Sequence, residues 1–146
     1  MKQKNERKYI IMSKKVKRII ISISCLIVAA VMFFGGTYLY NVMDYRRAIS
    51  NIVIQTPDIS LISDGIYNGS FDTFFISADV SVVVANHEIT DVIINDHYHD
   101  RGHGAEIVAI EVVNSQSLDV DTVSGATNSC LVILKAIQNA LESSNE

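Results

Sequence analysis

The hydrophobic pattern places one long apolar segment near the N-terminus and shorter periodic patterns after it. From Ile19 to Met43 no residue carries a charge. As a helix this segment would measure roughly 38 Å at about 1.5 Å per residue, which exceeds the roughly 30 Å hydrocarbon core of a bilayer. We therefore predict a single transmembrane helix over residues 19–43, with Tyr38 and Tyr40 at the level of the lipid headgroups.

Two runs farther along the chain have the period-two pattern of half-buried strands. The first run alternates polar residues with five apolar ones: Ile76, Ala78, Val80, Val82 and Val84. The second run is rich in β-branched residues and covers residues 88–95. Asn86-His87 between the two runs predicts a hairpin. Its turn type stays open, because histidine adopts a positive φ only at some steric cost.

Helical periodicity follows in the last part of the sequence. After Thr127, apolar residues fall on one helical face and polar residues on the other: Cys130, Ile133, Leu134, Ile137 and Leu141 against Lys135, Gln138, Asn139 and Glu142. This stripe predicts an amphipathic helix. Residues 105–116 are ambiguous, because their β-branched content suits a strand while their length suits a helix.

Charge is distributed unevenly along the chain. Eight of the 12 Lys and Arg residues precede Ile19, and together with Glu6 they give this leader a charge of +7. From Asp44 onward 15 acidic residues outweigh four basic ones, which gives −11. Because positive flanks stay in the cytoplasm, we predict a basic cytoplasmic leader over residues 1–18 and an extracytoplasmic C-terminal domain at the cell membrane. So acidic a domain argues against nucleic acid as a partner.

Other interpretations fit the apolar segment less well. A cleaved signal peptide would need a small-x-small cleavage site directly after its apolar run, and none is found there before Tyr38. A lipoprotein cysteine should follow its apolar stretch, whereas most of this stretch comes after Cys25. We therefore predict a retained signal anchor over residues 19–43.

The segment 44–63 is predicted to connect the anchor with the folded domain. Its first part, over residues 45–55, prolongs the membrane helix into water until Pro57 stops it at about Thr56. Asp64-Gly65 is a turn signal that begins the folded domain of residues 64–146.

The four residues Ser124-Gly125-Ala126-Thr127 stand directly before the amphipathic helix. Ser or Thr at this place is a typical N-cap, and the unpaired N–H groups of a helix start favour phosphate. A small residue beside those donors lets a bulky phosphorylated ligand approach the backbone. On these residues alone, an ordinary capped helix is the simpler interpretation.

A longer string, residues 116–129, resembles the flavinylation motif of the FMN-binding domain family. This family includes a flavin-carrying component of the sodium-pumping NADH:quinone reductase and many membrane-anchored electron carriers. Its pattern is an Asp, a few residues and then Ser-Gly-Ala-Thr, and Asp121 and Thr127 occupy these positions here. Residues 64–69 resemble the first turn and strand of the family, so the resemblance covers about residues 64–142.

The resemblance implies that residues 105–116 form a helix. The predicted fold is then α+β: a small antiparallel β-sheet packed by two helices and preceded by a single N-terminal transmembrane helix. It further implies that FMN is attached through its phosphate to Thr127. An FAD:protein FMN transferase cleaves FAD, transfers FMN and releases AMP, so Thr127 accepts a modification and no catalytic residue is predicted.

Several other residues are candidates for the FMN site. Ser124, Gly125 and Ala126 belong to the motif, while Asp121 is a cap, a hydrogen-bond partner of the turn or part of the sequence that the transferase recognises. Arg101 either lies beside the phosphate, adding to the roughly half charge of the helix dipole, or faces solvent.

The loop with three histidines, His97, His99 and His103, has the composition of a metal site. No cysteine or H-E-x-x-H helix accompanies it, and we predict no metal there. Cys130 is predicted to be a small packed residue rather than a nucleophile.

The function that follows from the resemblance is electron transfer. Membrane lipid and a membrane NADH dehydrogenase, or another redox protein, are the expected partners. A membrane-tethered sensor that binds a ligand without redox chemistry is the alternative. A reductase with its own substrate is disfavoured, because the sequence shows no second cofactor motif and no acid/base pair near the motif.

Overall fold

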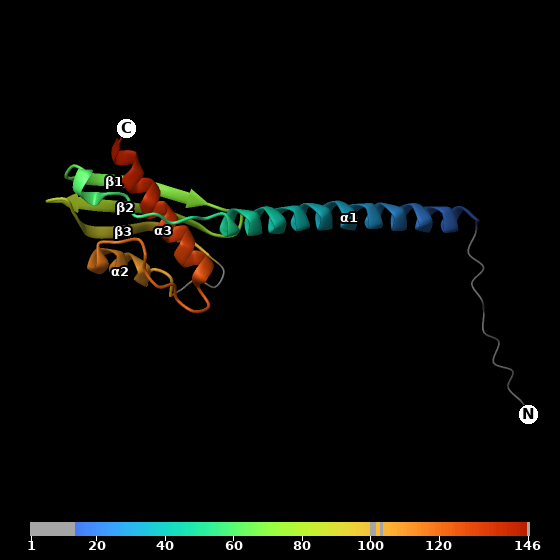
Figure 1. Ribbon diagram of the computed structural model, residues 1–146. Coiled ribbons are helices and arrows are strands. Elements are labelled where there is room, and N and C mark those ends of the chain that lie inside the picture. Colours follow the sequence, from blue (N-terminus) through green and yellow to red (C-terminus); the bar gives the residue numbers. More distant parts are fainter. Residues whose placement is uncertain (1–13, 100–101, 103, 146) are drawn as a thin grey trace, which may run out of the picture. The chain divides into compact units, whose positions relative to one another are not determined.

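The computed structural model describes residues 14–99, 102 and 104–145 (Figure 1). Two compact units divide the chain between Tyr40 and Asn41. The first helix, α1 (Lys14–Ser50), is the one candidate membrane span in the described part of the chain, on grounds of length and apolar composition. Apolar side chains along it, such as Leu26 and Met32, are exposed, which agrees with the predicted span over residues 19–43.

The helix α1 ends at Ser50, so the prediction that it continues to about Thr56 is wrong. Beyond Ser50 the chain gains more from tertiary packing than from further helical turns. Ile52 and Ile54 pack against the core, and the Gln55 N–H donates to Gln138 Oε1 at 3.2 Å. The segment that sequence suggested as a connector thus contributes to the domain.

A short 3-10 helix, η1 (Ile59–Leu61), leads into a three-stranded antiparallel sheet in the order β1-β2-β3. The strands are β1 (Gly65–Asp72), β2 (Ser77–Ala85) and β3 (Glu88–Tyr98). Both hairpins connect neighbouring strands, and the one between β2 and β3 is the hairpin that the period-two pattern predicted.

The β2–β3 turn has positive φ at both central residues, 55° at Asn86 and 61° at His87. These angles are those of a type I′ turn, whose twist matches that of the flanking strands. His87 Nδ1 lies 3.0 Å from the Ile62 carbonyl oxygen. This hydrogen bond helps histidine to occupy a position that usually favours Gly.

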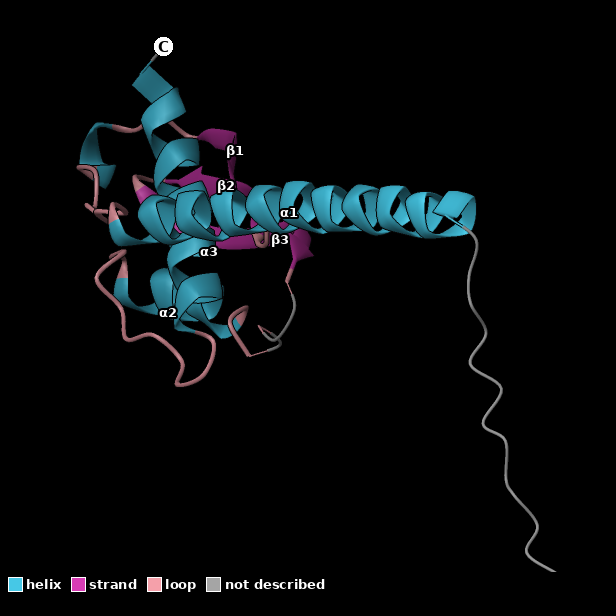
Figure 2. Ribbon diagram, turned by 90° about the vertical axis from the view of Figure 1, so that its right-hand side faces the viewer, coloured by secondary structure: helices cyan, strands magenta, loops and turns pink. Residues whose placement is uncertain are grey.

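Two helices cover one face of the sheet, namely α2 (Ile107–Ser115) and α3 (Thr127–Glu142) (Figures 1 and 2). The α+β class predicted from sequence is confirmed, and so is the helix within residues 105–116. Gln116 ends α2 in a left-handed conformation with φ 53°. Its side-chain amide pairs with the backbone of Ile89 in β3, through bonds of 2.8 Å in both directions.

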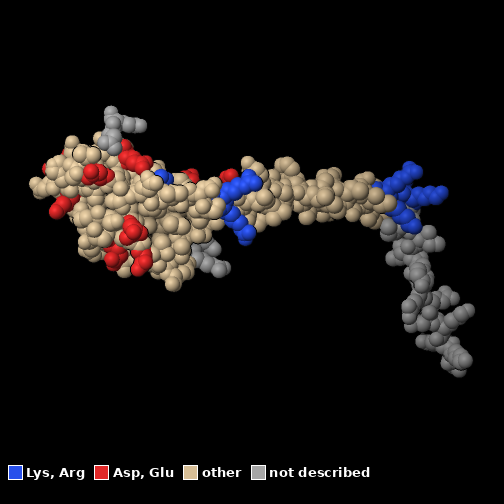
Figure 3. Space-filling model, viewed as in Figure 1, with Lys and Arg blue, Asp and Glu red and all other residues tan. Residues whose placement is uncertain are grey.

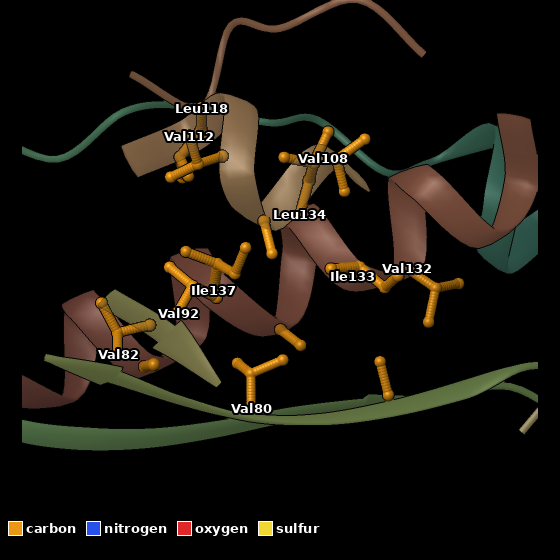
Figure 4. Packing of buried hydrophobic residues seen from close by; sticks show 14 of the residues in the cluster. Val80, Val82, Val92, Val108, Val112, Leu118, Val132, Ile133, Leu134 and Ile137 are labelled. Atoms are coloured by element: carbon orange, nitrogen blue, oxygen red, sulfur yellow. The ribbon is translucent and has the colours of Figure 1, made fainter. Parts of the chain in front are cut away.

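The core lies between the sheet and the helices. Figure 4 shows Val80 and Val82 of the sheet facing Ile133 and Ile137 of α3. In this view Val108 and Val112 of α2 lie above α3. All five alternating residues of β2 and its approach are buried, and so is the whole apolar stripe predicted for α3. These patterns therefore predicted burial correctly.

One residue of the predicted polar face of α3 is buried. Gln138 is 4% exposed, because the extended segment after α1 covers it. Its Oε1 accepts from Gln55, and its Nε2 donates to Glu142 Oε1 at 2.6 Å. Hydrogen bonds at both ends of the amide offset the loss of water.

Candidate functional site

The Ser-Gly-Ala-Thr segment forms a tight turn at the start of α3. The Ala126 N–H donates to the Val123 carbonyl oxygen at 2.9 Å, which makes Ser124 and Gly125 the central residues. Gly125 has φ 84°, as the third position of a type II turn requires. A Cβ placed on Gly125 would meet no atom of the described residues within 4 Å. The turn is therefore open on the side of this glycine.

Thr127 is the first residue of α3. The N-cap is Ala126, which makes no side-chain hydrogen bond, so the expectation of a Ser or Thr cap at this helix start is wrong. Thr127 is exposed, and its hydroxyl makes no hydrogen bond to a described residue. The motif thus presents its last hydroxyl outward.

The backbone of the first helical turn is also available to an anion. The first bond of the helix runs from the Cys130 N–H to the Ala126 carbonyl at 3.0 Å. The N–H groups of Thr127, Asn128 and Ser129 come before it and have no intrahelical acceptor. Together with the positive end of the helix dipole they favour a phosphate beside Thr127.

Cys130 holds the turn against the helix. Its side chain is fully buried, and its Sγ accepts a hydrogen bond from the Val123 N–H at 3.4 Å. Ala126 is also buried, at 7% exposure. The predicted role of Cys130 as a packed residue agrees with this environment, to which the structure adds a hydrogen bond to the turn.

Asn128 links the turn to the end of α1. Its Nδ2 donates to Tyr45 Oη at 2.8 Å, and the ring of Tyr45 packs edge-on against Phe75, with ring centroids 5.3 Å apart. Sequence reasoning missed this contact, because 83 positions separate the two partners and no local pattern connects them.

The loop after β3 also reaches the first turn of α3. A Cβ on Gly102 would clash with the side chain of Ser129, so the loop backbone passes directly over this serine. The Gly102 N–H donates to His99 Nδ1 at 3.0 Å. Arg101, the cation expected near a phosphate, lies outside the described residues, as does His103.

Asp121 is exposed and makes no hydrogen bond within the described residues. Of the three roles considered for it, capping and bonding to the turn therefore have no support in the described contacts. Recognition by a modifying enzyme needs an exposed side chain, and the position of Asp121 allows it.

Acidic side chains are spread over the visible face of the domain (Figure 3). Within the described part of residues 51–146, Lys135 is the only Lys or Arg. Backbone N–H groups and the dipole of α3 are consequently the nearest described sources of positive potential at Thr127.

A second polar cluster lies where β3 ends and α2 begins. His97 Nδ1 is 3.4 Å from Glu106 Oε1, and the His97 side chain is only 2% exposed. Burial is the main cause that lowers the pKa of His97, and the neighbouring His99 lowers it further, while Glu106 and Asp96 oppose the shift. His97 is therefore held in its neutral form near pH 7.

A comparison with protein families found one similar family. A sequence model of the FMN-binding domain matches residues 76–142, which run from the start of β2 to the end of α3 and include the complete turn. The comparison with curated proteins gave no match. Residues 76–142 are thus similar in sequence to the FMN-binding domain family.

Proposed function

We propose that this protein is a membrane-anchored flavoprotein that carries FMN covalently on Thr127 and transfers electrons outside the cytoplasm. The observation that carries the proposal is the position of Thr127. Its hydroxyl is exposed, makes no described hydrogen bond and stands at the N-terminus of a 16-residue helix. The sequence match to an FMN-binding family and the accessible hydroxyl of Thr127 together favour a covalent phosphoester.

The modification is a phosphoryl transfer from FAD. Thr127 Oγ1 forms a bond to the phosphorus on the FMN side of the pyrophosphate, and the bond to the AMP phosphate breaks. AMP leaves, and the hydroxyl proton passes to a base of the FAD:protein FMN transferase. Thr127 is a substrate in this step, while Asp121 remains exposed for recognition by the transferase.

The residues present fit such a group. The N–H groups of Thr127 and Asn128, which belong to exposed residues, are available to its phosphate oxygens, and Gly125 leaves open space beside the turn. Ser124 is exposed in the same turn, while buried Ala126 anchors it. When bound, FMN supplies one- and two-electron redox chemistry. A covalent link keeps the cofactor on a domain from which a dissociable flavin would be lost.

The first prediction from this proposal concerns membrane topology. The +7 leader should stay in the cytoplasm, which leaves the domain of residues 64–146 outside. Protease added to intact cells should then remove the domain, whereas the leader should become accessible only after lysis. A protected domain together with a cleaved leader would reverse the orientation.

The second prediction concerns electron flow. In membranes, addition of NADH should bleach the flavin absorbance of the wild-type chain through a membrane NADH dehydrogenase or another donor, and an added acceptor should restore it. The acidic surface should steer cationic partners, so the exchange rate should fall as ionic strength rises.

Two variants sharpen this experiment. Thr127→Ala should block the flow, while Thr122→Ala, a matched change at an exposed neighbour, should preserve it. Flavin that stays oxidised with every donor tested, or equal flow through Thr127→Ala, contradicts the carrier function and favours a ligand-binding sensor.

A further inference from the structure

We propose that His97, His99 and Glu106 form a binding site for a divalent transition-metal ion of the zinc type. Each residue offers one ligand atom, and the three atoms lie within 4.8 Å of one another. His97 lies near the end of β3, His99 directly follows this strand, and Glu106 directly precedes α2. The site is independent of the FMN attachment proposed for Thr127.

The chemistry of the three side chains selects the kind of ion. Two imidazoles and one carboxylate are a donor set of zinc sites that keep a fourth position open for water or another ligand. Calcium and magnesium prefer oxygen ligands throughout. A borderline ion such as Zn²⁺ therefore matches the cluster best.

His97 has a buried ring nitrogen that a bound ion would occupy. Its side chain is only 2% exposed, and its Nε2 has no hydrogen-bond partner among the described residues. A buried imidazole nitrogen without a partner is unusual in a folded protein. The neutral form favoured by burial has a free lone pair, which is the form that binds a metal.

His99 adds a specific consequence. The ring centroids of His97 and His99 are 4.4 Å apart, and His99 Nδ1 accepts a hydrogen bond from the Gly102 N–H. Neutral imidazole has a single lone pair. An ion bound by His99 therefore takes the lone pair that Gly102 uses, directly at Nδ1 or after a change of tautomer at Nε2. Metal binding and the Gly102 contact should exclude each other.

The test is a Zn²⁺ titration of the full chain in detergent, without a histidine tag and with Cys25→Ser to remove an exposed thiol. Competition with a chromophoric chelator should show one Zn²⁺ per chain. His99→Ala and Glu106→Gln should each weaken binding at least about tenfold. Glu111→Gln, an exposed acid on α2, is the matched control and should bind as wild type.

Glu106→Gln keeps the test decisive, because the Glu106 side chain is 56% exposed and its replacement leaves the core intact. In NMR spectra, Zn²⁺ should shift the Gly102 amide in wild type, and Glu106→Gln should need at least about tenfold more Zn²⁺ for the same shift. Thr127→Ala should bind Zn²⁺ as wild type does, which separates this site from FMN attachment. Absence of zinc binding at micromolar concentration, or unchanged affinity in both ligand variants, would overturn the proposal.

Discussion

Replacing Thr127 with alanine should leave the chain without covalently bound FMN. The proposed phosphoester needs the hydroxyl of residue 127, and alanine has none. The domain should stay folded, because Thr127 is exposed and the N-cap position is held by Ala126, so no side-chain capping bond is lost. Flavin fluorescence on a denaturing gel, after coexpression with the transferase, should disappear.

Two control variants and one further measurement define this result. Thr122→Ala should keep full fluorescence, since it removes a hydroxyl from an exposed residue outside the turn. Thr127→Ser restores a hydroxyl at the same position and should recover part of the signal. Mass spectrometry of the peptide around α3 locates the adduct. An adduct that persists in Thr127→Ala, on Ser124 or Ser129, would show that a different hydroxyl is the acceptor.

The largest loss of stability is expected from Gly69→Ala. Gly69 lies in β1, directly beneath α3, and a Cβ there would clash with the backbone of Ala136 and Ala140. A helix backbone cannot turn aside as a side chain does, so α3 must move away from the sheet. Overpacking of this kind should lower the free energy of unfolding by about 2–3 kcal/mol. Thermal unfolding followed by circular dichroism should show a midpoint roughly 10–20 °C lower.

Gly65→Ala is the matched control in the same strand. The nearest atoms to a Cβ on Gly65 belong to the Tyr67 ring, at 3.4 Å, which is ordinary contact with a side chain that can adjust. Its midpoint should stay within a few degrees of wild type. Equal midpoints for both alanine variants would mean that α3 does not need the bare backbone of Gly69.

Local periodicity was sufficient to predict the strand and the helix that bury one face. The alternation from Ile76 to Val84 predicted β2, and the stripe from Cys130 to Leu141 predicted α3, because each pattern records which side chains leave water. The position of Thr127 at the start of a helix was predictable for the same reason.

Contacts between distant segments were not predictable from sequence. Gln138 was assigned to the polar face because the sequence of α3 alone does not show which segment covers the helix. Its partner Gln55 lies far away in sequence. The hydrogen bond between Tyr45 and Asn128 was not predictable for the same reason. Glu106 escaped notice as a possible metal ligand because the turn into α2 alone brings it to His97.

The position of α3 along the chain sets an order of events for a newly made protein. All three strands precede α3, yet its ten buried residues supply the cover for β1 and β2. A nascent chain therefore exposes the apolar side of its sheet until this helix has emerged. Thr127 is the first residue of the same helix, so the closed core and the turn proposed to accept FMN appear together, late in maturation.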